Sequence, residues 1–179
     1  MKWKMDGDNM ARPKKVKYLV GDFETTVYDG QKNTEVWASA IVEMFMEDVS
    51  VLHSIDETWN YLKELKSNLI VNSCEWKHDK EMYNNTFKYT ISEMGQWYSI
   101  KVKINDKIIE FRDSLKLLPF SVKEIGKAFK TKHQKLDMEY TGFRYAGCEI
   151  KPEEKKYIAN DVLVVKEALE IVFQDVHNR

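Results

Sequence analysis

Two carboxylates stand at the end of an apolar run near the start of the chain. The segment Gly21-Asp-Phe-Glu-Thr-Thr26 follows the residues Lys-Tyr-Leu-Val, and it separates Asp22 from Glu24 by one position. In a β-strand, residues i and i+2 share a face, so both carboxylates point the same way. Like charges this close repel unless they share a proton or a cation, and hard divalent cations prefer carboxylate oxygens. The pair predicts either a cation site or a strand that runs out into a polar loop.

A third carboxylate, Asp161, lies in the segment Tyr-Ile-Ala-Asn-Asp-Val, four residues after Tyr157 and therefore on the same helix face. Asp is a poor helix former, and this one stands beside an apolar stripe, so it needs a partner. If the helix packs against the end of the first strand, Asp161 meets Asp22 and Glu24 around one site for Mg²⁺ or Mn²⁺. Without metal, repulsion among the three should raise at least one of their pKa values.

Strands and helices alternate along the chain in a way that could bring these residues together. The hydrophobic patterns predict strands at 16–23, 36–45, 49–55, 68–72 and 108–111, a hairpin within 86–105, and helices opened by Ser54, over 121–130, and from Pro152 onward. We expect the buried stripe of the last helix to be Ile158, Val162, Val165, Leu169 and Val172. Strands mixed with helices indicate a layered α/β or α+β protein.

Composition limits the alternatives. The chain has 179 residues, 43% of them hydrophobic, and a net charge of −1, which favours one packed domain and excludes a strongly basic nucleic-acid coat. Basic residues nevertheless concentrate in 1–17 and 123–135. Two cysteines and no long apolar span favour a reduced cytosolic compartment and no membrane contact. We expect a flexible basic leader over 1–15 and one domain over 16–179.

Several short blocks, in order, resemble the 3′–5′ exonuclease domain of protein-primed phage DNA polymerases of family B. They are DFETT, MGQWY, DSLKLLPF, the spacing of Lys135 and Tyr140, KPEE and YIANDV, and the resemblance runs from about Lys17 to the end. It implies an RNase H-like (DnaQ-like) α/β fold, a mixed sheet flanked by helices. It also implies metal ligands at Asp22, Glu24 and Asp161, and a water-orienting role for Tyr157.

The resemblance extends to further residues. It implies a catalytic-site lysine near the scissile phosphate at Lys135, and contacts with the single-stranded 3′ end at Thr25, Asn72, Ser114, Leu115 and Tyr140. Taken by themselves, these residues have ordinary explanations as well. Thr25 could bond backbone at a strand end, Lys135 could be solvated, and Tyr140 could be a half-buried ring.

The second motif departs from the family pattern. That motif reads Asn-x-x-x-Asp-Gly, whereas here Trp76 stands four residues after Asn72, and Asp79, with no glycine after it, is the nearest substitute. We expect 74–85 to form a short irregular connection. Two-metal hydrolysis of a phosphodiester uses a second ion to stabilise the leaving oxygen. Loss of the motif's Asp therefore predicts weak or absent turnover.

Two functions stay open at the level of sequence. One is a stand-alone, weakened exonuclease that hydrolyses single-stranded DNA from its 3′ end with Mg²⁺ or Mn²⁺. The other is a catalytically degenerate exonuclease fold of phage or mobile-element origin, which binds nucleic acid or inhibits a host nucleic-acid-handling protein. Either would act in the cytoplasm of a bacterium or of an infected host.

Overall fold

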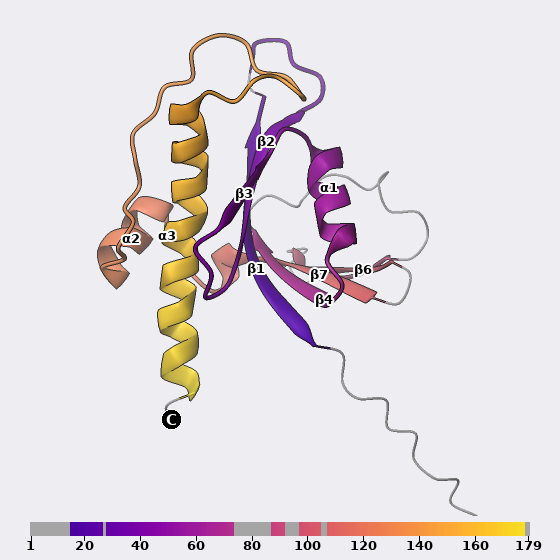
Figure 1. The fold of residues 1–179 in the computed structure, drawn as a ribbon, viewed down its shortest axis with the longest axis vertical. Coiled ribbons are helices and arrows are strands. Elements are labelled where there is room, and N and C mark those ends of the chain that lie inside the picture. Colours follow the sequence, from indigo (N-terminus) through magenta and orange to yellow (C-terminus); the bar gives the residue numbers. More distant parts are fainter. Residues whose placement is uncertain (1–14, 27, 74–86, 92–96, 105–106, 178–179) are drawn as a thin grey trace, which may run out of the picture.

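A computed structural model describes residues 15–26, 28–73, 87–91, 97–104 and 107–177 (Figure 1). Its strands form one mixed sheet in the order β3-β2-β1-β4-β7-β6-β5. Their bounds are β1 Val16–Thr25, β2 Val36–Glu43, β3 Val49–Leu52, β4 Asn68–Ser73, β5 Phe87–Ile91, β6 Trp97–Ile104 and β7 Lys107–Asp113. β1 is parallel to β4, and β4 is parallel to β7, while the remaining pairs are antiparallel.

Helices cover both faces of this sheet. α1 (Ile55–Glu64) lies on one face, and α2 (Val122–Phe129) and α3 (Pro152–His177) lie on the other (Figure 1). Neighbouring residues of β1 point to opposite faces of the sheet. Leu19 packs in the hydrophobic cluster that contains Leu62 of α1, and Val20 packs in the cluster that contains Val162 of α3. The predicted mixed sheet flanked by helices is confirmed.

Capping residues stand where the sequence predicts that α1 and α2 begin. Ser121 caps α2 in a full capping box with Glu124, and the helix ends at Phe129, before the C-cap residue Lys130, which has a left-handed backbone. Ser54 caps α1 through the Glu57 backbone N–H, but the Glu57 carboxylate accepts its bond from His53 N at 2.8 Å. The Glu57 carboxylate therefore bonds the backbone one residue before Ser54, whereas in a full capping box it would bond the N–H of Ser54 itself.

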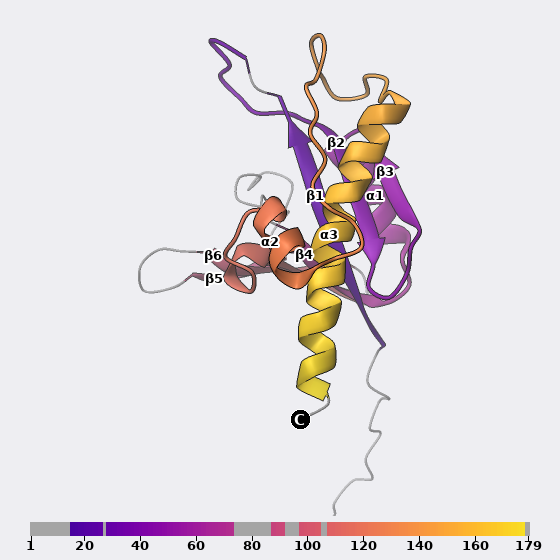
Figure 2. The same ribbon diagram turned by 90° about the vertical axis from the view of Figure 1, so that its left-hand side faces the viewer.

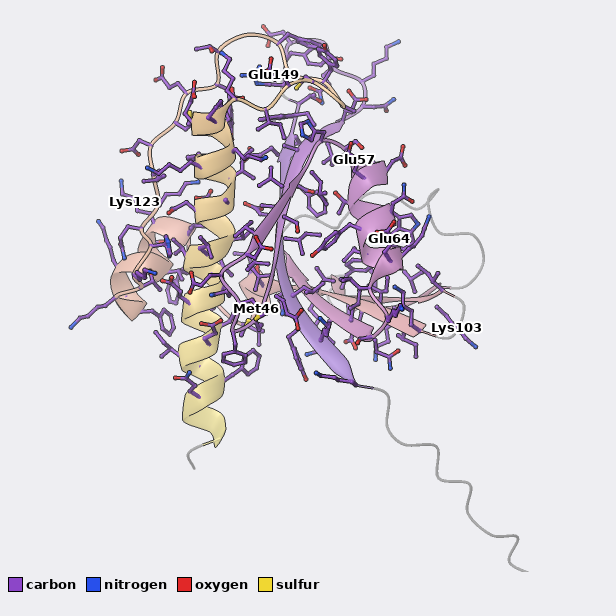
Figure 3. All side chains as sticks on the ribbon, viewed as in Figure 1. Met46, Glu57, Glu64, Lys103, Lys123 and Glu149 are labelled. Atoms are coloured by element: carbon purple, nitrogen blue, oxygen red, sulfur yellow. The ribbon has the colours of Figure 1, made fainter. Side chains whose placement is uncertain are left out.

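The strand predicted over 36–45 ends two residues early, at Glu43. The cause is Phe45, whose φ of 65° is left-handed and ends the extended conformation. Two side chains of α3 hold the turn there: Glu170 Oε1 accepts from Phe45 N at 2.6 Å, and the buried Lys166 Nζ donates to Met46 O at 2.6 Å. Met46 lies beside α3 in Figure 3.

More of the surface of α3 is buried than the five predicted apolar positions alone would cover. The five predicted positions are buried or partly buried, and Asn160, Asp161 and Lys166 are buried too. Other segments cover these polar positions. Asn160 and Asp161 are hydrogen-bonded to the segment after α2, and Lys166 donates to Met46 O in the turn after β2. None of the helices in the described part of the chain combines the length and apolar character that crossing a membrane requires.

Two sequence-based expectations cannot be compared with the structure. Of the leader expected over 1–15, only Lys15 is described. The connection expected over 74–85, with Trp76 and Asp79, lies outside the described residues.

Candidate metal and active site

Three carboxylates, two from the end of β1 and one from α3, converge on one point. Figure 2 shows α3 running across β1, against which it packs. One oxygen each of Asp22, Glu24 and Asp161 lies within 4.8 Å of the other two. Two oxygens that bind the same cation at ~2.1–2.5 Å can be at most about 5 Å apart, so this spacing suits one ion. The predicted convergence is confirmed. It arises because Val20, on β1, and Ile158 and Val162, on α3, share one core cluster, which fixes the helix against the strand.

Asp161 is the buried member of the three, with 3% of its surface exposed. Its Oδ2 accepts a hydrogen bond from Lys135 Nζ, whereas Oδ1 is buried and has no hydrogen-bond partner among the described residues. Burial raises the pKa of Asp161, although Lys135 opposes that shift. A raised pKa was expected from repulsion, but burial is its main cause. An unpaired buried carboxylate oxygen costs about 1–3 kcal/mol, and a cation is the partner that would relieve it.

Lys135 joins the carboxylates to Tyr157. Its Nζ donates to Tyr157 Oη at 2.5 Å and lies 4.2 Å from the centroid of that ring. Burial alone would lower the pKa of Lys135, but its hydrogen bonds to Asp161 and Tyr157 outweigh burial, and the pKa is raised. The ammonium therefore stays charged, and Lys135, Tyr157 and Asp161 form one cluster. The catalytic role that the resemblance implies for Lys135 stays a prediction.

Hydrogen bonds hold the segment that carries Lys135 against α3. Asn160 Nδ2 donates to Gln134 O at 2.6 Å, and Glu167 accepts from His133 N at 3.1 Å and pairs with His133 Nδ1 at 2.5 Å. Sequence reasoning missed these anchors. The only signal for Asn160 was its place beside Asp161, and His133 and Glu167 are 34 positions apart.

Glu167 should stabilise the fold in a pH-dependent way. Burial alone would raise the pKa of Glu167, but the bonds from His133 lower it more, so the net shift is downward. A lowered carboxylate pKa contributes stability above the unfolded value of about 4.3, and that contribution is lost as the pH falls through the folded value. We expect Glu167→Gln to cost about 1–3 kcal/mol of unfolding free energy at pH 6.5 and clearly less at pH 3.5, in urea titrations. An equal cost at both pH values would contradict this assignment.

Tyr140 borders the same cluster. Its ring meets Tyr157 edge-on at a centroid distance of 5.9 Å and Trp37 at 5.0 Å. Burial, reinforced by the nearby Glu24 carboxylate, raises the pKa of Tyr140, so its phenol stays protonated. Tyr140 is therefore a half-buried ring whose neutral hydroxyl lies beside the Glu24 carboxylate.

The remaining predicted contacts lie at the ends of the parallel strands. Thr25 ends β1, after a shift of register, and Ser114 and Leu115 follow β7 directly, the first buried and the second 41% exposed. Asn72, near the end of β4, is 1% exposed, and its amide donates to Leu19 O at 3.4 Å. Their DNA contacts stay predictions, and Asp79 lies outside the described residues.

The fold agrees with the relatives of the chain. It belongs to the family described as DNA polymerase type B, organellar and viral, which matches residues 59–149. It is 35% identical over 176 residues to the DNA polymerase of Bacillus phage B103 and 36% identical over 178 residues to that of Bacillus phage phi29. In both comparisons the match covers 86% of this chain and 30% of the relative, so the chain spans about 30% of the length of these polymerases.

Solved structures agree with this relationship. The phi29 DNA polymerase complexed with single-stranded DNA superposes with a TM-score of 0.74 at 31% identity, over 91% of this chain and 32% of that one. Its complex with primer-template DNA gives a TM-score of 0.76 at 30% identity, over 92% and 32%. The predicted resemblance to the exonuclease domain of protein-primed polymerases, and the RNase H-like α/β fold that it implied, are confirmed.

Proposed function

We propose that this chain is a metal-dependent 3′–5′ exonuclease domain that acts on single-stranded DNA with weakened turnover. The observation that supports it best is the cluster of Asp22, Glu24 and Asp161 oxygens within 4.8 Å of one another. The phi29 DNA polymerase, to which the chain is similar, has been solved with single-stranded DNA.

Each residue of the cluster has a defined part in this proposal. Asp22, Glu24 and Asp161 would hold Mg²⁺ or Mn²⁺, which when bound activates water and stabilises charge on the phosphate. The Lys135 ammonium offsets negative charge at the scissile phosphate. Because the Tyr157 oxygen already accepts from Lys135, its own O–H hydrogen is left to orient the attacking water.

The proposed weakening rests on the second motif. Trp76 stands where the family pattern has a metal-supporting Asp, and Asp79 is the nearest carboxylate that could replace it. Removal of one preorganised electrostatic stabiliser commonly lowers a rate by about 10²–10³. We therefore expect slow hydrolysis, faster with Mn²⁺ than with Mg²⁺, because Mn²⁺ tolerates irregular coordination better.

A 5′-labelled single-stranded oligonucleotide tests both parts of the proposal. With Mn²⁺, the unaltered protein should shorten it slowly from the 3′ end, and Asp22→Ala should slow this at least about 100-fold. The Asp79→Ala variant measures whether that carboxylate contributes. Fast Mg²⁺-dependent digestion that survives Asp79→Ala would contradict the weakening.

The alternative function is a binding protein that has lost turnover, and the Trp76 position favours it. No digestion by any variant, together with retained binding of DNA or of a host or phage protein, would establish that class instead of the exonuclease.

A further inference from the structure

Three exposed aromatic rings form a cluster at one end of the molecule. Tyr28 is 49% exposed, Phe143 63% and Tyr145 53%. The rings of Tyr28 and Phe143 meet edge-on at 5.4 Å between centroids, and those of Phe143 and Tyr145 are stacked at 6.3 Å with 24° between their planes. Figures 1 and 2 both place the loop after β1 and the loop before α3 together at this end.

The two loops that carry these rings are anchored to the protein. Thr26 and Glu35 exchange two hydrogen bonds, of 2.8 and 3.0 Å, across the base of the first loop. The second loop is tied to the first by Ala146 N, which donates to Glu35 Oε2 at 3.2 Å, and to the segment after β3 by Gly147 N, which donates to His53 O at 2.9 Å. The rings are thus displayed on a fixed surface, and exposure of three adjacent aromatic side chains is unusual unless they bind something.

This cluster is continuous with the carboxylate site. Phe143 is three residues after Tyr140, which borders Glu24, and Tyr28 is four residues after Glu24 itself. Extended chain spans at most ~3.3–3.6 Å per residue, so these connections cover no more than about 10–15 Å. A strand with its 3′ end at the carboxylates could reach the rings within a few nucleotides.

We propose that Tyr28, Phe143 and Tyr145 form a base-stacking platform for single-stranded DNA whose 3′ end lies at the carboxylates. This inference rests on the proposed function. Aromatic rings stack on any base, at about 1–3 kcal/mol for each base, without reading sequence. The loops around the rings carry Asp29, Glu35 and Glu149 as well as Lys32, Arg144 and Lys151, and Figure 3 places Glu149 at this end. With the charges balanced, stacking rather than phosphate neutralisation supplies the binding.

Fluorescence anisotropy with a labelled single-stranded oligonucleotide, in Ca²⁺ to limit hydrolysis, tests the platform. The variant Phe143→Ala/Tyr145→Ala should bind on the order of tenfold or more weakly than the unaltered protein. The ratio of the two Kd values should stay constant between low and high salt, because no phosphate contact is removed. A matched control, Tyr18→Ala/Phe45→Ala, removes one exposed Tyr and one exposed Phe elsewhere and should bind like the unaltered protein.

An oligonucleotide with abasic positions upstream of its 3′-terminal nucleotides isolates stacking. The unaltered protein should bind this abasic oligonucleotide as weakly as the variant binds the intact one. The variant should bind the intact and the abasic oligonucleotides with the same affinity. Equal binding of the intact oligonucleotide by the variant and by the unaltered protein would overturn the platform alone and leave these rings as a protein-binding surface. Failure of the unaltered protein to bind any single-stranded DNA would overturn the proposed substrate and the platform together.

Discussion

Replacing Asp161 with Asn should strongly weaken divalent-cation binding while the fold persists. The substitution keeps the shape of the side chain but removes the most buried charge of the three-carboxylate cluster. Loss of a residue that only hydrogen-bonds to a metal ligand already lowers metal affinity about 10–100-fold. Loss of a ligand should cost more, so we expect Mn²⁺ affinity to fall at least about 100-fold. Calorimetric titration of Mn²⁺ into Asp161→Asn and unaltered protein measures this directly.

Glu153→Gln is the matched control for that experiment. Glu153 is an exposed acid in the first turn of the same helix, and its replacement should leave Mn²⁺ affinity unchanged. Thermal unfolding of both variants without metal verifies that they are folded. Unchanged Mn²⁺ affinity in folded Asp161→Asn would show that the cluster is not the cation site.

Replacing Glu154 with Ala should lower the free energy of unfolding more than Glu167→Gln does. Glu154 is 2% exposed, and its carboxylate pairs with the Arg144 guanidinium and accepts from Lys151 N at 2.9 Å. The Arg144 guanidinium also lies 5.4 Å from the centroid of the buried Trp37 ring. Breaking a buried pair by removing one partner costs about 3–5 kcal/mol, because the other charge stays buried without compensation.

Thermal unfolding provides the test of this pair. For a chain of this size a loss of 3–5 kcal/mol lowers the Tm by about 6–20 °C. The neighbouring Glu153→Ala, which removes an exposed carboxylate from the same turn, should change the Tm by no more than about 2 °C. A Glu154→Ala variant as stable as Glu153→Ala would mean that Arg144 finds water or another partner.

Local sequence signals predicted the elements and the main cluster. Ser121 and Pro152 mark helix starts through their own backbone chemistry, and the period of Ile158, Val162 and Leu169 defines the buried side of α3. The i+2 spacing of Asp22 and Glu24 fixes a shared face without knowledge of the fold. The meeting with Asp161 depended on one further assumption, that α3 packs on β1.

The parts that sequence did not predict are contacts between distant segments. The Phe45 turn depends on Glu170 and Lys166, more than 100 positions away, and no local pattern marks Phe45 as left-handed. The same holds for His133 with Glu167, and for the ring contact of Tyr28 with Phe143. Such partners are chosen by tertiary packing, which periodicity and capping signals do not encode.

The most direct test of the cation site is anomalous scattering from crystals of the unaltered protein soaked in Mn²⁺. We predict one strong peak within about 2.5 Å of oxygens from Asp22, Glu24 and Asp161. The Lys135 ammonium should lie outside the coordination shell of the ion. A saturating soak that shows no peak there, or a peak held by other residues, would contradict the site on which the proposed hydrolysis depends.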